Sequence, residues 1–176
     1  GNREDSNLTK ARSLFKESGD LGYDKAMFQY ALMCRDGKGG DVDLEEARVY
    51  FKKAADVNSG NIKSTYEYAL MCRNGKGGDV DLEDAKSYFK KAADADPGST
   101  SAMFDYALMC RDGEGGDVNL EEARAYLKKA ADANGGVEAM FEYASMCRDG
   151  VGGDKSLKEA KSYFKKAADA DPGHAG

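Results

Sequence analysis

The chain has 176 residues, of which 41% are hydrophobic and 33% are charged, and its formal net charge is -6. This negative charge repels phosphate backbones and anionic lipid headgroups, which argues against nucleic acid and membrane surfaces as partners. No apolar run is long enough to span a bilayer, and no charged-then-apolar leader opens the sequence. Proteins and peptides remain as the expected partners.

The chain opens on a lone helix that is followed by four similar units. LTKARSLFKESGD from Leu8 matches LEEARVYFKKAAD from Leu44, so residues 1–21 correspond to the second half of a unit. The complete units are expected at residues 22–59, 60–97, 98–134 and 135–176. At the end of the chain, ADADPGHAG copies the segment that starts at Ala93 and then stops, which predicts a truncated tail in the last unit.

The four units share one segment, which repeats at a nearly constant interval. YALMCRDGKGGD begins at Tyr30 and returns with small changes at Tyr68, Tyr106 and Tyr143, in steps of 38, 38 and 37 residues. Such periods are typical of stacked helical units, each of which needs its neighbours to bury its apolar face. We therefore expect nine helices and one long exposed surface.

Each unit begins with a helix that we call the A helix, expected in the first unit from about Asp24 to Arg35. Its buried face carries apolar residues at i, i+3, i+4 and i+7, namely Met27, Tyr30, Ala31 and Cys34. Gly37 is expected to end this helix in the left-handed conformation.

A second helix, the B helix, follows a short turn in every unit. Asp43 is a natural N-cap, with Glu46 three residues further on. The later units repeat this pattern with Asp81 and Asp84, Asn119 and Glu122, and Ser156 and Glu159. The inward face of the first B helix is expected to consist of Leu44, Ala47, Tyr50, Phe51, Ala54 and Ala55. Breaks between units are expected at Gly60, Pro97 with Gly98, and Gly135 with Gly136.

One cysteine stands at the same position of every unit: Cys34, Cys72, Cys110 and Cys147. Stacked helices lie about 8 to 10 Å apart, whereas a disulfide needs Cα atoms closer than about 7 Å. We therefore expect four free thiols, which favours a reducing compartment such as the cytoplasm.

These residues resemble the Sel-one-like repeat (SLR) family, a relative of the tetratricopeptide repeat (TPR). The family signature combines a G-x-G turn, a later Asp, an Ala, an aromatic pair and Lys-Ala-Ala. The first unit matches it with Gly37, Gly39, Asp43, Ala47, Tyr50, Phe51, Lys53, Ala54 and Ala55. Three positions depart from it, because Ala31 replaces the usual Gly, Cys34 the usual Tyr and Gly40 the usual Val.

The resemblance implies an all-α fold, a right-handed alpha-alpha superhelix (solenoid) of SLR/TPR-like helix-turn-helix repeats. Its relatives are adaptor proteins that assemble complexes in signalling and protein quality control. The usual period is near 36 residues, so the curvature of the superhelix cannot be taken from the family.

A second stripe on the A helices, which we call the A-helix stripe, is the candidate peptide-binding groove. It comprises Phe28, Leu32 and Arg35; Tyr66, Leu70 and Arg73; Phe104, Leu108 and Arg111; and Phe141, Ser145 and Arg148. By resemblance these positions line the concave side, where rings and guanidinium groups suit a peptide with apolar anchors and acidic side chains. In the alternative interpretation the rings pack between helices, and the arginines pair with acids of their own array.

The units differ most near the start of the A helix, at Lys25, Lys63, Ser101 and Glu138. The changing charge at these positions is expected to set specificity along the groove. A polar and acidic row, formed by Gln29, Glu67, Asp105 and Glu142, adjoins the stripe. Such a row is typical of a solvated face.

Nothing in the sequence indicates catalysis, a metal or a cofactor. The acids between Asp36 and Glu46 do not have the spacing of a calcium loop, and the glycines lack the strand and GK[ST] of a phosphate loop. The cysteines are dispersed and the only histidine, His174, lies near the end, so zinc sites and Cys-His or Ser-His-Asp systems are not expected.

The sequence therefore predicts a non-catalytic scaffold or adaptor that binds a protein or peptide. A purely structural or consensus-designed array with no dedicated ligand is the alternative. End-to-end self-association is also expected, because no further unit in this sequence covers the last B helix. The residues expected to be uncovered are Tyr163, Phe164, Ala167 and Ala168.

Overall fold

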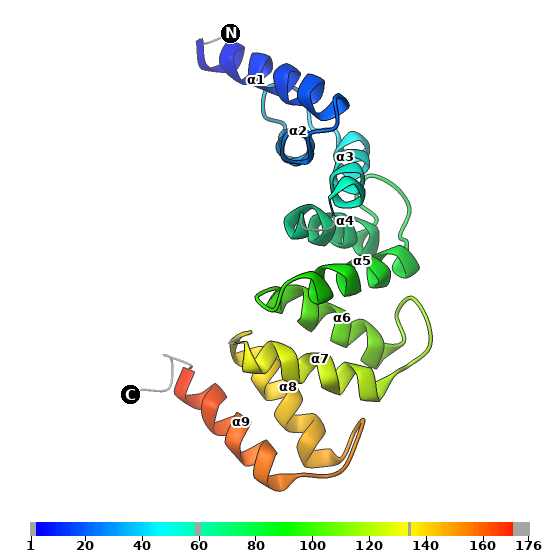
Figure 1. Ribbon diagram of the computed structural model, residues 1–176, viewed down its shortest axis with the longest axis vertical. Helices are drawn as coiled ribbons and strands as arrows, with labels where there is room; N and C mark the ends of the chain where they lie inside the picture. The colour runs from blue at the N-terminus through cyan, green and yellow to red at the C-terminus, as the bar shows by residue number, and fades with distance from the viewer. Residues whose placement is uncertain (1–2, 59–60, 134, 171–176) are drawn as a thin grey trace. The chain divides into compact units, whose positions relative to one another are not determined.

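A computed structural model describes residues 3–58, 61–133 and 135–170 of the chain (Figure 1). Over these ranges the chain forms nine α-helices and no strand, which confirms the all-α fold. The helices are α1 (Arg3–Asp20), α2 (Asp24–Asp36), α3 (Leu44–Val57), α4 (Ile62–Asn74), α5 (Leu82–Ala95), α6 (Thr100–Asp112), α7 (Leu120–Asp132), α8 (Gly136–Asp149) and α9 (Leu157–Ala170). The expected break at Gly60 and the histidine at position 174 lie outside the described residues.

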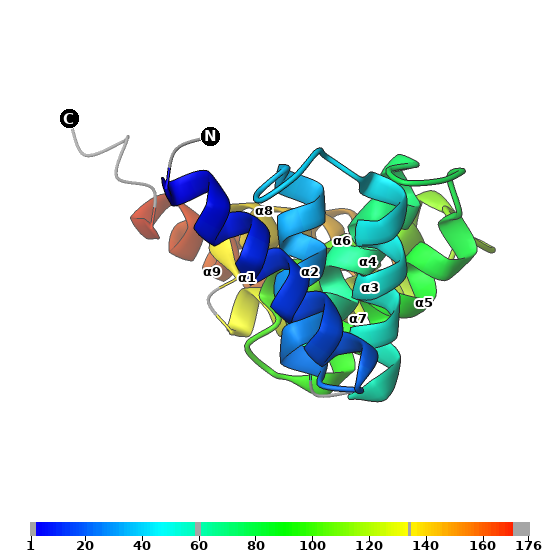
Figure 2. The same cartoon turned by 90° about the horizontal axis from the view of Figure 1, so that it is seen from above.

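The helices form two compact units, residues 1–91 and residues 92–176. In the first unit α2 packs against α1 and α3, and α3 packs against α4; Figure 2 shows α2 and α3 side by side. In the second unit α7 packs against α6 and α8, and α8 lies along α9 (Figure 1). The A helices are α2, α4, α6 and α8, and each packs against a B helix.

The A helices follow the sequence pattern closely. Met27, Tyr30, Ala31 and Cys34 are all buried, as their spacing predicts. Helix α2 extends one residue beyond the expected end, to Asp36, and Gly37 follows it with φ of 67° in the left-handed region. The other A helices also end at a left-handed glycine, at Gly75, Gly113 and Gly150.

The expected N-caps of the B helices are formed. The side chain of Asp43 accepts a hydrogen bond from the backbone N–H of Glu46 at 2.9 Å. The caps Asp81, Asn119 and Ser156 make the equivalent bond at 3.0, 3.1 and 3.3 Å. The N–H of Asp43 donates to the carbonyl oxygen of Cys34 at 2.9 Å, which leaves the Glu46 carboxylate available for other partners.

The inward face of the first B helix is buried at five of the six expected positions. Ala47, Tyr50, Phe51, Ala54 and Ala55 are at most 3% exposed. Leu44 begins the helix and is only half-buried; its backbone lies beside the turn between the A and B helices of the next repeat. A Cβ added to Gly77 in that turn would lie 2.0 Å from the carbonyl oxygen of Leu44, and Gly77 has φ of 73°. Only glycine allows this approach of two backbones.

The last B helix is covered more fully than the sequence suggested. Tyr163 and Ala167 are buried, so the expectation that they are uncovered is wrong. The ring of Tyr163 packs edge-on against Tyr143 at 4.8 Å, because the B helix contacts its own A helix there. Phe164 is half-buried and Ala168 is exposed.

The cysteines, possible metal ligands and possible membrane spans can each be located in the described part of the chain. All four cysteines are free and buried. Among the described residues, no group of three His, Cys, Asp or Glu side chains is placed to hold a metal ion. No helix in the described ranges combines the length and apolar character needed to cross a membrane.

Candidate binding surface

The rings and leucines of the A-helix stripe are neither fully buried nor fully exposed. Six apolar members are half-buried: Phe28, Leu32, Tyr66, Leu70, Phe104 and Leu108. The ring of Phe28 lies 5.8 Å from that of Phe51, and the ring of Tyr66 lies 5.5 Å from that of Phe89. In these two cases the aromatic side chain packs on a B helix and also leaves part of its surface to solvent.

The last copy of the stripe is more open. Phe141 is 53% exposed, although its ring lies 5.3 Å from that of Phe164. Ser145 replaces the leucine of the other copies, and Arg148 is exposed. Arg148 binds the neighbouring Asp149 at 2.8 Å.

The arginines of the stripe bind carboxylates of the protein itself. In the first compact unit, residues 1–91, Arg35 donates to Asp36 at 2.8 Å and forms an ion pair with Glu67 at 3.0 Å. The hydrogen bond from Arg35 holds the pKa of Asp36 below its usual range. Glu67 belongs to the acidic row of the next repeat, so this pair joins two successive A helices. An acidic ligand would have to compete with these carboxylates.

The second compact unit, residues 92–176, repeats this arrangement. Arg111 binds Asp112 at 2.7 Å and Glu142, on α8, at 3.0 Å. The guanidinium group of Arg73 lies 5.2 Å from the centre of the Phe89 ring, and that of Arg148 lies 5.9 Å from the centre of the Phe164 ring. The positions expected to set specificity, Lys25, Lys63, Ser101 and Glu138, are all exposed. Their assignment, like that of the stripe, stays a prediction.

A connection between successive repeats was not foreseen from the sequence. Arg48 on α3 donates from Nη1 to the carbonyl oxygen of Asp79 at 2.8 Å and from Nη2 to the Sγ of Cys72 at 3.4 Å. Arg12 reaches the equivalent groups of Asp41 and Cys34, and Arg124 reaches those of Asp154 and Cys147. A B helix thus holds the turn and the thiol of the following repeat.

This connection explains two of the three departures from the repeat pattern. A Cβ added to Gly40 would lie 2.7 Å from Nη1 of Arg12, so the glycine provides the space that the guanidinium group occupies. Cys34 is fully buried and its small sulfur atom accepts a hydrogen bond from the same arginine at 3.3 Å. Cys34 and Gly40 therefore form one structural set with Arg12. The structure gives no comparable reason for Ala31.

Tyrosine hydroxyls form a second series of connections. Tyr68 on α4 donates to Asp84 at 2.7 Å, and Lys52 on α3 binds both groups, at 3.1 and 3.2 Å. Along the B helices, Tyr88 donates to Asp56 at 2.7 Å. The equivalent pairs are Tyr50 with Asp20, Tyr126 with Asp94 and Tyr163 with Asp132.

These contacts shift the acidity of the groups involved. The hydrogen bond from Tyr68, together with Lys52, holds the pKa of Asp84 below its usual range. Burial raises the pKa of Tyr68 and that of the Cys72 thiol. Because each group is bonded to others of the same cluster, the shifts reflect structural contacts and do not by themselves indicate catalysis.

The sequence contained a signal for both series. An arginine stands four residues after the leucine that begins the matching segment in three B-helix copies, at Arg12, Arg48 and Arg124. Each B segment also ends with an aspartate, at Asp20, Asp56, Asp94, Asp132 and Asp169. These positions can be read from the sequence, but the residues that they contact lie 22 to 32 positions away along the chain.

Comparison with known proteins agrees with the repeat pattern. The family model described as Sel1 repeat matches residues 24–59, 62–97, 100–135 and 137–172. A search of curated protein sequences finds no match.

Solved structures share the fold. A Sel1 repeat protein from Oxalobacter formigenes is 21% identical, with a TM-score of 0.81 over 93% of this chain and 65% of its own. The uropathogenic Escherichia coli protein c5321, a protective antigen with an SLR fold, is 25% identical, with a TM-score of 0.77 over 90% of this chain and 33% of its own. MamA is 16% identical, with a TM-score of 0.59 over 97% of this chain and 95% of its own. The chain therefore spans about two thirds of the first structure and one third of the second.

Proposed function

We propose that this chain, which belongs to the Sel1 repeat family, is a non-catalytic scaffold or adaptor that binds a protein or peptide through the A-helix stripe. The family supports a role in protein interaction, and the stripe is the surface that recurs in every unit. On the same helices, side chains of the core, such as Met27 and Ala31, are buried. The half-buried state of Phe28, Tyr66 and Leu70 is the observation that carries the proposal.

Partly exposed rings on a rigid helix are suited to partner binding. A ring that already packs on a B helix, as Phe28 does on Phe51, loses little conformational freedom when a ligand covers it. Large aromatic side chains of this kind supply much of the energy at protein interfaces. We propose apolar side chains of the partner as the main anchors.

Charge would then set orientation and specificity. Lys25 and Lys63 place a positive charge near the start of each A helix of the first compact unit. In the second compact unit the same positions hold Ser101 and Glu138. Acidic groups of a partner could also bind the stripe arginines by displacing Glu67 from Arg35. Such competition favours selectivity more than affinity, because a new ion pair replaces an existing one.

A purely structural array is the alternative, and the internal pairs of Arg35 with Glu67 and of Arg111 with Glu142 are the observations that favour it. In that case the stripe would serve only to join successive A helices. A test must therefore remove apolar surface without breaking these pairs.

Substitution of Leu70→Ser with Leu108→Ser meets this requirement, because Ser145 already occupies the equivalent position on α8. The control is Val49→Ser with Ala125→Ser on exposed positions of α3 and α7, where Ser87 and Ser162 occur in other copies. We expect the first pair to lose, and the control to keep, a partner that wild-type protein captures and crosslinks at the stripe. The melting temperatures of both should stay near that of wild type.

Equal capture by both double variants would contradict the proposal. Crosslinks confined to the B helices would do the same, since the partner would then bind another face.

A further inference from the structure

The acidic and basic side chains are divided unequally between the two compact units. Residues 1–91 carry sixteen of each kind, whereas residues 92–176 carry sixteen acidic and ten basic side chains. The entire formal charge of -6 therefore belongs to the second unit. A net charge of this size attracts oppositely charged ligands over a distance of about one Debye length, roughly 8 to 10 Å.

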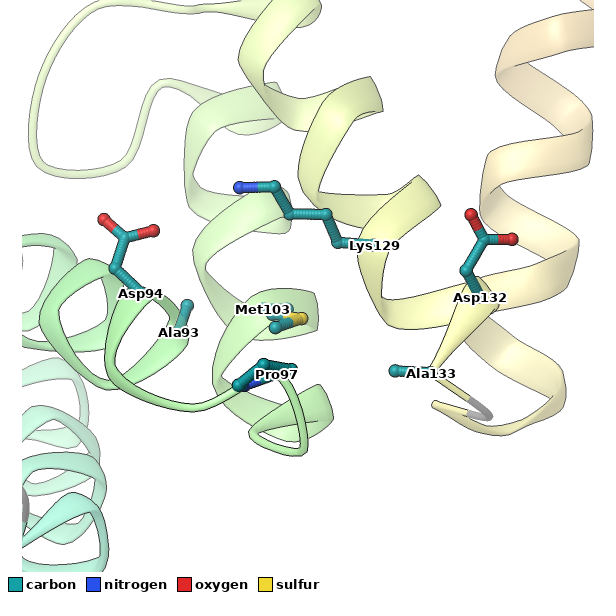
Figure 3. A pocket seen from close by; sticks show the side chains of 7 residues that line it. All are labelled: Ala93, Asp94, Pro97, Met103, Lys129, Asp132 and Ala133. Atoms are coloured by element: carbon teal, nitrogen blue, oxygen red, sulfur yellow. The ribbon is translucent and has the colours of Figure 1, made fainter.

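The same unit contains a pocket of about 490 Å³ that lies apart from the A-helix stripe (Figure 3). It lies where the last turns of α5 and α7 meet the first turn of α6. Its apolar lining is Ala93, Pro97, Met103 and Ala133, and its polar lining is Asp94, Lys129 and Asp132. None of these residues belongs to the stripe.

The polar groups of the pocket are held by other parts of the unit. Asp94 accepts a hydrogen bond from Tyr126. Asp132 accepts one from Tyr163 and forms an ion pair with Lys128 at 2.6 Å. The ammonium group of Lys129 lies 4.1 Å from the centre of the Tyr126 ring. An apolar side chain could enter without leaving these groups unbonded, which would otherwise oppose binding.

The rim favours a basic partner. The lining contains two carboxylates, those of Asp94 and Asp132, and one ammonium group, that of Lys129. Helices α5 and α7 both end at the pocket, and the C-terminus of a helix adds partial negative charge. The N-terminus of α6 contributes the opposite sign, so two helix C-termini and one N-terminus meet at the pocket.

We propose that this pocket is a second binding site, which takes one large apolar side chain of a basic peptide segment. Ala93, Pro97, Met103 and Ala133 cover the apolar side chain, and the negative charge of the unit selects lysines or arginines on both sides of it. The site does not depend on the A-helix stripe. The two could bind separate segments of one partner or two different partners.

The first unit offers a matched control position. Val57 follows the same B-segment register as Ala133 and is also exposed, so an identical substitution can be made at both positions. Ala133 has φ of -86° and lies just beyond the end of α7, so a larger side chain fits its backbone conformation. Ala133→Trp should fill the mouth of the pocket, and Val57→Trp should leave it open.

The experiment titrates the isotope-labelled full chain with three heptapeptides and follows the backbone amide signals by NMR. The first peptide is Lys-Lys-Gly-Leu-Gly-Lys-Lys, the second replaces its leucine with serine, and the third replaces its lysines with glutamates. We expect the first to shift the amides of Thr100 and Ala133 with saturation, and the second to bind roughly tenfold more weakly because the apolar anchor is lost. The glutamate peptide should not saturate these signals. Ala133→Trp should weaken the first peptide at least fivefold, and Val57→Trp less than twofold.

Contacts between the peptide leucine methyl groups and the methyl groups of Met103 and Ala133, observed by NMR in the wild-type chain, give a readout that does not depend on any variant. Their presence supports the site even if Ala133→Trp fails to fold. Equal affinity of the leucine and serine peptides, or of the lysine and glutamate peptides, would overturn the proposal. The double variant Leu70→Ser with Leu108→Ser should lose partner binding at the stripe and still bind the lysine peptide at the pocket. The stripe proposal and the pocket proposal can therefore fail separately.

Discussion

The connection from an A helix to its B helix, the A–B turn, differs from the connection to the next A helix, the B–A loop. The A–B turns, residues 37–43, 75–81, 113–119 and 150–156, keep nearly one sequence. The B–A loops, residues 21–23, 58–61, 96–99 and 133–135, vary in both length and sequence.

The structure gives the physical reason for this difference. In the second A–B turn, Gly77 lies against the backbone of Leu44, and Arg48 binds the carbonyl oxygen of Asp79. The turn is therefore part of the contact between repeats. The described B–A loop contacts include local bonds, such as the bond from the Ser99 N–H to the carbonyl oxygen of Asp96 at 3.0 Å. In the loop 58–61 the side-chain amides of Asn58 and Asn61 also donate to the Asp24 carboxylate, and these contacts rest on a pair of side chains that the other loops do not share. Repetition of the turn reflects packing, whereas variation of the loop leaves room for functional differences such as the proposed pocket at Pro97.

Alanine substitution of one glycine in each kind of connection should give the largest contrast. We expect Gly77→Ala to lower the free energy of unfolding by about 3 to 5 kcal/mol, because it combines a positive φ with contact against a backbone carbonyl. Gly98→Ala should change it by less than about 0.5 kcal/mol, since its Cβ would lie 3.4 Å from the Asp96 carboxylate. Urea unfolding measures both, and equal losses would break the comparison.

The arginine connection should have a smaller but clear effect. Arg48→Ala removes two hydrogen bonds from a charged donor, one to the Asp79 carbonyl oxygen and one to the Cys72 thiol. We expect a loss of about 1.5 kcal/mol in urea unfolding. Arg48→Lys should lose less, because Lys86 occupies this register in another B helix. A neutral result for Arg48→Ala would show that the turn does not need the preceding B helix.

A buried hydroxyl near the start of helix α4 offers a stabilising change. Ser64 is buried and its Oγ has no hydrogen-bond partner. In the other three repeats an alanine stands at this position, namely Ala26, Ala102 and Ala139. Ser64→Ala should raise the free energy of unfolding by about 1 kcal/mol, because an unbonded hydroxyl no longer has to be buried. A fall in the melting temperature would contradict this. Lys63→Ala, at the neighbouring exposed position, is the control.

The smallest expected effect is a change in pH dependence. The folded-state pKa of Asp84 lies below its ordinary value, so its contribution to stability is present above about pH 4 and is lost as the pH falls through the folded-state pKa. Asp84→Asn should therefore reduce the difference in stability between pH 7 and pH 3. Urea unfolding at both pH values tests this, with Asp81→Asn as a control for the N-cap. An unchanged difference would show that the contacts with Tyr68 and Lys52 contribute nothing.

Much of the fold could be predicted because its signals are local. The spacing of Met27, Tyr30 and Cys34 is enough to define a helix face, and Gly37 and Asp43 mark a helix end and a helix start within a few residues of it. Four copies of the pattern then made the repeat architecture evident.

The contacts between repeats could not be predicted in the same way. Arg12 meets Cys34 and the Asp41 carbonyl oxygen only after two helices have packed, and nothing local in the sequence specifies that contact. The candidate stripe was located as a pattern, but the pairing of Arg35 with Glu67 depends on how successive A helices are placed. The pocket depends on a B–A loop whose sequence differs from those of the loops at residues 58–61 and 133–135.

Native-state hydrogen exchange on the full chain tests the distinction between the two connections most directly. In every A–B turn, the residue that caps the B helix donates its N–H to the carbonyl oxygen of the cysteine, at 2.8 to 3.0 Å; these residues are Asp43, Asp81, Asn119 and Ser156. We predict that the amides of Asp43, Asp81 and Ser156 exchange as slowly as those of the helix cores. Each of these bonds closes an A–B turn that an arginine of the preceding B helix also holds, namely Arg12, Arg48 or Arg124. The amides of Asn61 and Ser99, in the B–A loops, should exchange much faster. Equal protection of the two sets would contradict the view that the A–B turns are the structural joints and the B–A loops are free to vary.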